Sequence, residues 1–265
     1  MVLSKEKSTK KILTARIHQF RKTVWEYYER EGRVLPWRLR TDIRASKREM
    51  YRILVSEIML QQTQVSRVIA KFAEFMKKFP TMEALASSSQ SEVLSVWQGL
   101  GYNRRALYLK RTAEELVLSH GSKIPCDVDI LKKLPGIGEY TARALVVFSY
   151  NVPEVFIETN IRTAFIHFFF DDKNNVHDRE LVPLIERALE GNHPRAWYYA
   201  LMDYGSMIKR TVGNANIKSA HYTKQSRFKG SRRQARSLLL REVLVRGKLS
   251  KKHADDLLVP TEFES

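Results

Sequence analysis

Two acidic side chains stand where proton chemistry is possible: Glu57 lies inside the apolar run 53–59, and Glu158 follows Phe156 and Ile157. An acid on an apolar segment loses the solvation of its charged form, so it holds its proton more tightly and can donate it. The alternative for Glu57 is a glutamate on a helix surface that forms an ion pair. About twenty residues before Glu158 the chain reads Leu-Pro-Gly-Ile-Gly-Glu-Tyr-Thr-Ala, at 134–142.

Segment 134–142 predicts a hairpin between two helices. Gly136 and Gly138 let backbone N–H groups approach an anion, and a helix that begins near Glu139 adds partial positive charge at its N-terminus. Such a turn binds a phosphate without reading a base. A phosphate anchor followed by an acid with apolar neighbours indicates an enzyme that acts on a nucleotide.

The charge of the chain favours a polyanionic partner. Its 265 residues include 46 Lys and Arg against 29 Asp and Glu, a net charge of +17. An excess of this size favours nucleic acid or an anionic membrane. No apolar run reaches the ~18 residues of a membrane span, and the first residues lack the apolar core of a signal peptide. We therefore expect a cytoplasmic, nucleic-acid-binding protein; a basic surface that only aids solubility is the alternative.

Residues 209–252 concentrate this charge. They hold fourteen Lys and Arg and a single acid, Glu242, interleaved with Tyr222 and Phe228. Backbone phosphate contact and a solvated basic face both fit this pattern.

Helical spacing dominates the chain, and no segment reads as a convincing strand. Breaks at Pro36, Pro80 and Gly121 separate the apolar-periodic segments. We expect N-caps at Thr81 and Ser91. The pattern predicts an all-α fold, with helices over 10–31, 48–60, 65–79, 104–120, 127–134, 139–150, 160–170, 177–189, 194–209, 232–246 and 250–257.

Six segments together resemble the helix-hairpin-helix DNA glycosylases, and among them the A/G-specific adenine glycosylases. The most specific is Val55-Ser-Glu-Ile-Met-Leu-Gln-Gln-Thr-Gln-Val65. The others, in the order and spacing of the family, are Leu-Pro-Trp-Arg at 35–38, Phe-Pro-Thr at 79–81, Trp-Gln-Gly-Leu-Gly-Tyr at 97–102, the hairpin at 134–142 and Leu-Met-Asp-Tyr-Gly at 201–205. The resemblance covers roughly residues 15–210.

The resemblance implies two helical lobes with a central cleft. One lobe would span residues 40–150 and contain the hairpin unit 127–149. The second would combine residues 8–39 with 151–230, and residues 231–265 would form a short basic helical tail.

Cutting a base from its sugar needs a proton on the leaving base and negative charge near the sugar cation. By resemblance, Glu57 is the acid that protonates a flipped adenine. Glu158 stands where the family has an aspartate that stabilises the cation, so its carboxylate reaches one methylene further. Asn160 would orient that carboxylate or cap a helix. A misplacement near 1 Å can cost about a hundredfold in rate.

Tyr140 stands where bifunctional relatives carry a lysine. Tyrosine forms no imine, so the resemblance implies base removal without strand cleavage. Gln61, Gln62 and Thr63 interrupt an apolar helix and would contact the base opposite the target. The further DNA-binding positions implied are Tyr102, Leu134, Gly136, Ile137, Gly138 and Arg38.

Relatives carry four cysteines that hold an iron–sulfur cluster, and their spacing falls here on Lys209, Asn216, Ser219 and Gln225. None is a thiolate, so we expect no cluster and no other metal cofactor; a monovalent cation at the hairpin carbonyls stays open. The family's C-terminal domain for 8-oxoguanine does not fit within 231–265.

These features together predict a monofunctional DNA glycosylase of base excision repair. It would be a monomer, associated with the nucleoid, that removes adenine opposite guanine or 8-oxoguanine in double-stranded DNA. A thymine or uracil glycosylase for mismatches with guanine, and a non-catalytic DNA-binding relative, are the alternatives.

Overall fold

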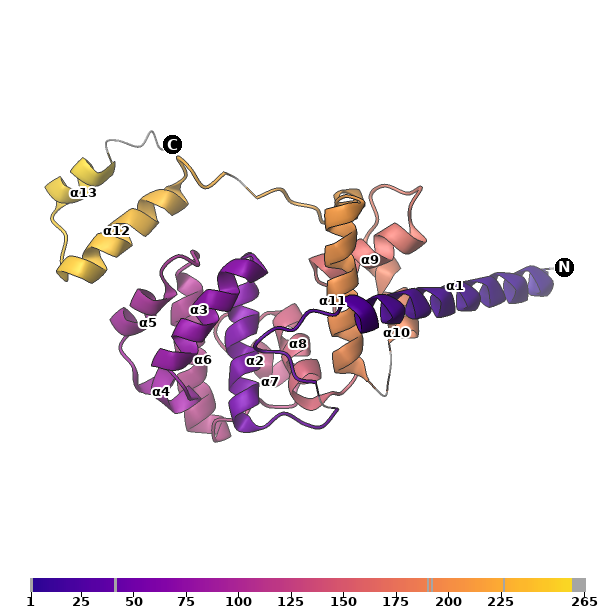
Figure 1. Ribbon diagram of the computed structural model, residues 1–265, viewed down its shortest axis with the longest axis horizontal. Helices are drawn as coiled ribbons and strands as arrows, with labels where there is room; N and C mark the ends of the chain where they lie inside the picture. Colours follow the sequence, from indigo (N-terminus) through magenta and orange to yellow (C-terminus); the bar gives the residue numbers. More distant parts are fainter. Residues whose placement is uncertain (1, 41, 190, 192, 226, 259–265) are drawn as a thin grey trace. The chain divides into compact units, whose positions relative to one another are not determined.

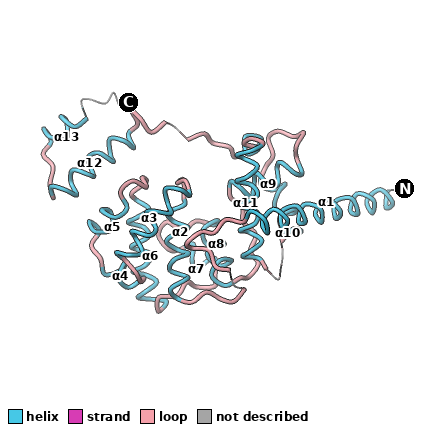
Figure 2. The backbone as a smooth tube through the Cα atoms, in the orientation of Figure 1, coloured by secondary structure: helices cyan, strands magenta, loops and turns pink. Residues whose placement is uncertain are grey.

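The computed structural model describes residues 2–40, 42–189, 191, 193–225 and 227–258. Within these residues the fold is helical, with one isolated parallel bridge between Val176 and Ser219 in place of a sheet (Figures 1 and 2). The predicted all-α fold is confirmed. Its helices are α1 (Val2–Glu31), α2 (Lys47–Leu60), α3 (Val65–Lys78), α4 (Met82–Ser87), α5 (Gln90–Trp97), α6 (Arg104–His120), α7 (Val128–Lys132), α8 (Glu139–Tyr150), α9 (Thr159–Phe169), α10 (Asp178–Ala188), α11 (Pro194–Thr211), the 3-10 turn η1 (Ala215–Lys218), α12 (Arg232–Arg246) and α13 (Lys251–Leu258).

Local sequence explains where the helices begin. Ser46 and Ser89 each form a capping box with the glutamate three positions on, which satisfies backbone donors at the starts of α2 and α5. Thr81 caps α4 as expected. The predicted cap at Ser91 is wrong, because Ser89 has the glutamate partner that a capping box requires and Ser91 lies inside α5.

The chain divides into two compact units. The first combines the residues up to Arg44 with Val146–Thr223. Its core is aromatic: Phe20 of α1 is fully buried against the rings of Phe165, Phe168, Phe169 and Trp197. Burial of several aromatic side chains is the main driving force for joining α1, α9 and α11.

Gly205 brings α11 directly against the N-terminus of α9. A Cβ added there would lie 2.0 Å from the backbone oxygen of Asn160. Backbone cannot yield as a flexible side chain can, so only glycine fits. The last residue of the 201–205 motif therefore sets how closely α11 supports the segment that begins at Glu158.

The second unit combines Ala45–Leu145 with the residues from Lys224 onward. It holds α2 to α7, the first turns of α8, and the tail helices α12 and α13. Its core includes Leu54, Phe72, Phe75 and Trp97, all almost wholly buried. This unit contains Glu57, Tyr140, the hairpin and the 61–64 turn, and the first unit contains Glu158 and Asn160.

Candidate active site and DNA-binding elements

Glu57 and Tyr140 meet within the second unit. Glu57 is only 7% exposed and lies on α2 among buried apolar residues. Tyr140 is the second residue of α8, and its hydroxyl donates a hydrogen bond to Oε2 of Glu57 at 3.0 Å. A carboxyl group in apolar surroundings that is oriented by a hydrogen-bond donor is well suited to general acid chemistry.

The polar turn after α2 is held in a strained conformation. Gln62 has a positive φ of 54°, which side chains other than glycine rarely adopt. Its side chain is exposed, whereas that of Gln61 is partly buried and donates to Oγ1 of Thr141 at 3.3 Å. Thr63 donates through its hydroxyl to the carbonyl of Gln61 at 3.3 Å. Of the three predicted DNA contacts, Gln62 is the one whose side chain projects into solvent.

Arg105 of α6 holds this turn in place. Its guanidinium donates to the carbonyl oxygens of Ile58 at 2.8 Å and Met59 at 3.0 Å, and to the carbonyl of Gln61. These are carbonyls at the C-terminus of α2, which lack partners within the helix and favour a positive charge nearby. The same guanidinium reaches Oγ1 of Thr63 at 3.0 Å. Arg105 therefore fixes both the end of the helix that carries Glu57 and the turn that follows it.

Arg105 also joins a second turn to the first. It donates to the carbonyl of Gly101 at 3.1 Å and lies over the rings of Trp97 and Tyr102, at 5.5 and 5.4 Å. Burial lowers its pKa to about 10, partly offset by Tyr102, so the group stays charged at neutral pH. Sequence reasoning missed Arg105, because its acceptors come from separate segments and are mostly backbone atoms.

Tyr102, a predicted DNA contact, has its hydroxyl hydrogen-bonded to two side chains from the C-terminal part of the second unit. It accepts hydrogen bonds from Nε2 of Gln225 and from Nη1 of Arg233, the latter at 2.8 Å. Its backbone φ of 48° is positive, so the turn at 99–102 is also strained. The structure gives the hydroxyl partners within the protein, which the sequence pattern did not indicate.

The hairpin forms between α7 and α8. Gly136 has φ 75°, and a Cβ there would lie 2.9 Å from Cβ of Tyr108, so both conformation and space require glycine. Gly138 faces open space. Leu134 and Ile137 are buried, at 6% and 5% exposure. The two apolar side chains anchor the loop. The groups of the loop that remain available to a phosphate are therefore backbone N–H groups.

In the first unit, Glu158 is the N-cap of α9. Its Oε1 accepts from the backbone N–H of Asn160 at 2.8 Å and of Ile161 at 2.9 Å, and the Asn160 side-chain amide donates to Oε2 at 3.2 Å. Asn160 thus orients the carboxylate, and the cap is Glu158 rather than Asn160. Burial raises the pKa of Glu158, although these hydrogen bonds lower it in part.

Arg38, a predicted DNA contact, forms an ion pair within the protein. Its side chain is 6% exposed, and its Nη1 and Nη2 donate to the two carboxylate oxygens of Asp203 at 2.8 and 2.7 Å. Arg33 binds the same carboxylate through its backbone N–H and its Nε. The 35–38 and 201–205 motifs therefore meet in a buried ion pair, in which both terminal nitrogens of the Arg38 guanidinium bind the Asp203 carboxylate.

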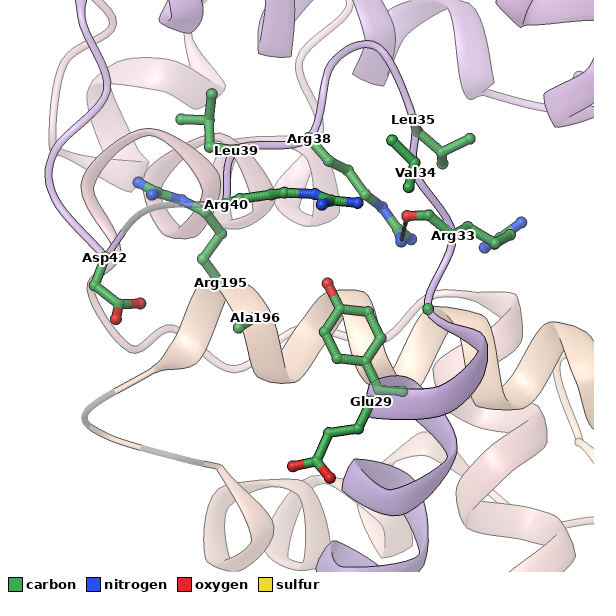
Figure 3. A pocket seen from close by; sticks show the side chains of 12 residues that line it. Glu29, Arg33, Val34, Leu35, Arg38, Leu39, Arg40, Asp42, Arg195 and Ala196 are labelled. Atoms are coloured by element: carbon green, nitrogen blue, oxygen red, sulfur yellow. Dashed lines mark hydrogen bonds between the residues drawn. The ribbon is translucent and has the colours of Figure 1, made fainter.

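A cavity of about 340 Å³ lies beside this ion pair. Arginine side chains from the loop 33–40 line it, together with Arg195 at the start of α11 (Figure 3). Arg195 is buried and donates to the carbonyls of Phe148 at 2.8 Å and Ile43 at 3.0 Å. Arg38 is the one predicted site residue among the residues that line this cavity.

The positions that correspond to cluster cysteines do not fit an iron–sulfur cluster. Lys209, Asn216, Ser219 and Gln225 carry no thiol, and the one cysteine in the sequence, Cys126, is far from them along the chain. Contacts of protein atoms hold the loop instead. The carbonyl of Val176 accepts from the backbone N–H of Ala220 at 2.9 Å.

Comparison with known proteins assigns the family. The profile described as "HhH-GPD superfamily base excision DNA repair protein" matches residues 55–188, half of the chain, including Glu57, the hairpin and Glu158. The chain belongs to the HhH-GPD superfamily. The resemblance inferred from the sequence motifs is thereby confirmed.

Curated relatives in this superfamily are adenine DNA glycosylases. The protein of that name from Buchnera aphidicola subsp. Baizongia pistaciae is 34% identical over 191 residues, which cover 71% of this chain and 52% of the relative. That from Mycobacterium tuberculosis is 40% identical over 136 residues, 51% of this chain and 43% of the relative. The chain thus spans about half the length of the curated relatives it matches.

Solved structures agree on the fold. A thermostable thymine-DNA glycosylase superposes with a TM-score of 0.62 at 24% identity, over 73% of this chain and 87% of that one. At this identity the likeness establishes a shared HhH glycosylase fold and nothing about substrate. Among the described residues, none of the helices combines the length and apolar character that crossing a membrane requires.

Proposed function

We propose that this protein is a monofunctional DNA glycosylase that removes adenine mispaired with guanine or 8-oxoguanine in double-stranded DNA. The observation that carries the proposal is the buried Glu57 carboxyl with the Tyr140 hydroxyl 3.0 Å from it. The 32–40% identity to proteins named adenine DNA glycosylase supports adenine as the target.

In this proposal Glu57 donates its proton to a ring nitrogen of the adenine. The bond between that base and C1′ of the sugar then breaks with its electron pair moving to the base, which the proton neutralises. Water adds to C1′ and gives up a proton, which restores the acid. The Tyr140 hydroxyl holds one carboxyl oxygen and so fixes which way the acid points.

For Glu158 we propose the second carboxylate role, support of the positive charge that develops on the sugar. Two backbone N–H groups and the Asn160 amide hold its carboxylate rigidly. A preoriented negative charge stabilises a cation at little cost in reorganisation. The cap also makes Glu158 necessary to α9, so loss of activity on its removal needs a stability control.

Strand cleavage by β-elimination requires an amine that forms an imine with the sugar. Tyr140 has a phenol at the position where the bifunctional relatives carry lysine, and its hydroxyl is turned to Glu57. We therefore propose base release that leaves an intact abasic strand. The proposal involves no iron–sulfur cluster. We also propose that the hairpin carbonyls can bind a monovalent cation, which titration with the metal ion would test directly.

The test offers four duplexes: adenine opposite 8-oxoguanine, adenine opposite guanine, thymine opposite guanine and uracil opposite guanine. Released base is measured by chromatography, and strand breaks are measured with and without hot alkali. We expect adenine release from the first two, with breaks only after alkali. Glu57→Gln should abolish release while it preserves folding and DNA binding, because the amide keeps the size of the side chain but has no acidic proton.

Glu49→Gln is the matched control, since Glu49 lies on the same helix but serves the capping box of Ser46. It should leave base release intact. Release of thymine or uracil without adenine would replace adenine as the target. DNA binding with no base released from any duplex would show a non-catalytic relative, and full activity in Glu57→Gln would refute the assignment of the acid.

A further inference from the structure

The tail, defined here as residues 224–252, is the most basic part of the chain. It holds eleven Lys and Arg and one acid, Glu242. The Glu242 carboxylate accepts from Arg246 at 2.8 Å. Ten of the cations are exposed: Lys224, Arg227, Lys229, Arg232, Arg236, Arg241, Arg246, Lys248, Lys251 and Lys252.

The tail is attached to the rest of the second unit at a defined point. Gln225 and Arg233 both donate hydrogen bonds to the Tyr102 hydroxyl, and the Arg233 guanidinium lies 5.6 Å from the centre of the Tyr102 ring. Helix α12 also packs on α5, the helix just before the 99–102 turn. The charge is thus fixed beside a turn that Arg105 connects to the Gln62 turn.

Helix α12 arranges part of this charge in a row. Arg236 and Arg246 stand four and fourteen positions after Arg232, so the three lie within about 80° around the helix at 100° per residue. The row is about 21 Å long at 1.5 Å per residue. A duplex presents roughly a dozen phosphates over that length, enough for each arginine to bind one.

We propose that the tail is a second DNA-backbone-binding element, distinct from the hairpin and fastened to the protein at Tyr102. Its ligand is the phosphate backbone of duplex DNA, bound without regard to sequence. The inference rests on the proposed function for its choice of partner. In this inference Gln225 attaches the tail to Tyr102. Gln225 stands at a position where relatives carry a cluster cysteine.

The first test measures how duplex affinity depends on salt. The variant R232Q/R236Q/R246Q removes three phosphate contacts, so the slope of log K against log salt should fall by about 2.7. Relative to 1 M salt, where this term vanishes, affinity near 0.1 M salt should fall about 500-fold. The variant with lysine at the same three positions should keep the wild-type slope, because a point charge suffices to bind a phosphate.

The matched control is K47Q/R48Q/K77Q, which removes three exposed cations from other helices of the same unit. It should change the slope by less than one. Equal losses in the tail and control variants would show an effect of net charge alone and overturn the proposal, as would an unchanged slope in the tail variant. Thermal unfolding identifies any variant that has lost its fold.

The second test addresses the attachment with no change of charge. Gln225→Leu removes one of the two donors to Tyr102 and should raise hydrogen–deuterium exchange across α12, with weaker protection of α12 by DNA. Unchanged exchange would refute attachment through Gln225.

Base release separates this inference from the proposed function. If wild type releases adenine but the tail variant keeps the wild-type salt slope, the tail inference alone is refuted. If the tail variant has a lowered salt slope but wild type releases no adenine, the proposed function alone is refuted.

Discussion

Replacement of Arg105 tests whether one buried guanidinium positions the end of α2. In Arg105→Ala the carbonyls of Ile58 and Met59 lose their charged donor in a buried place. An unsatisfied buried acceptor costs about 1–3 kcal/mol, so the two together cost about 4 kcal/mol. The carbonyls of Gln61 and Gly101 are partly exposed, and water can replace the lost donor there.

The unfolding assay should show this loss as a fall in Tm of about 10 °C, at 2–4 °C for each kcal/mol in a chain of this size. Arg105→Lys should recover only part of it, because an ammonium cannot present the planar fork that reaches Ile58, Thr63 and Gly101 together. Arg111→Ala, at an exposed position of the same helix, is the control and should leave Tm within 1–2 °C.

Activity gives the more specific readout. Release of adenine by Arg105→Lys, measured well below its Tm, should fall in kcat more than in affinity for undamaged duplex, because the basic surfaces are unchanged while the turn at 61–63 and the C-terminus of α2 shift. A Tm within 2 °C of wild type in Arg105→Ala, or wild-type kcat in Arg105→Lys, would refute the reasoning.

Three further perturbations follow from the geometry. Gln62→Gly should leave stability within about 1 kcal/mol, because glycine accepts φ 54°, yet lower adenine release; equal release would mean that the side chain does not contact DNA. Gly205→Ala should destabilise by several kcal/mol, since its Cβ would clash with the backbone of α9; a Tm near wild type in thermal melts would contradict this packing. Glu158 has a raised pKa, so its stabilising contribution is complete below about pH 4 and is lost as pH rises through the folded value. In urea melts, wild type should therefore lose stability relative to Glu158→Gln as the pH rises above about 4, and a constant difference would refute the shift.

The sequence was sufficient for features that local patterns encode. The hairpin residues 134–142, the boundaries of α2 and α3 and the apolar surroundings of Glu57 all follow from periodicity and glycine placement. The predicted start of α1 is wrong, because the helix begins at Val2 rather than at Lys10. Sequence also gave no indication that Arg38 pairs with Asp203, since the partners are 165 positions apart.

Two features needed coordinates for physical reasons. Arg105 binds mainly backbone carbonyls, which every residue has, so no side-chain pattern marks its acceptors. Glutamate is seldom a helix N-cap, because Ser, Thr, Asp and Asn reach the backbone N–H groups more readily. Sequence reasoning therefore places the possible cap at Asn160, two residues after the true cap at Glu158.

Tyr140 stands two residues after Gly138, so the hairpin loop leads directly into the turn of α8 whose tyrosine hydroxyl contacts Glu57. Such a turn is stiff, and its backbone rises only about 3 Å over two residues. Under the proposed function, the seating of a phosphate at Gly138 would therefore also set where the strand lies relative to the Tyr140 hydroxyl. Phosphate binding at the hairpin and orientation of the Glu57 carboxyl group by Tyr140 would then depend on the same few residues.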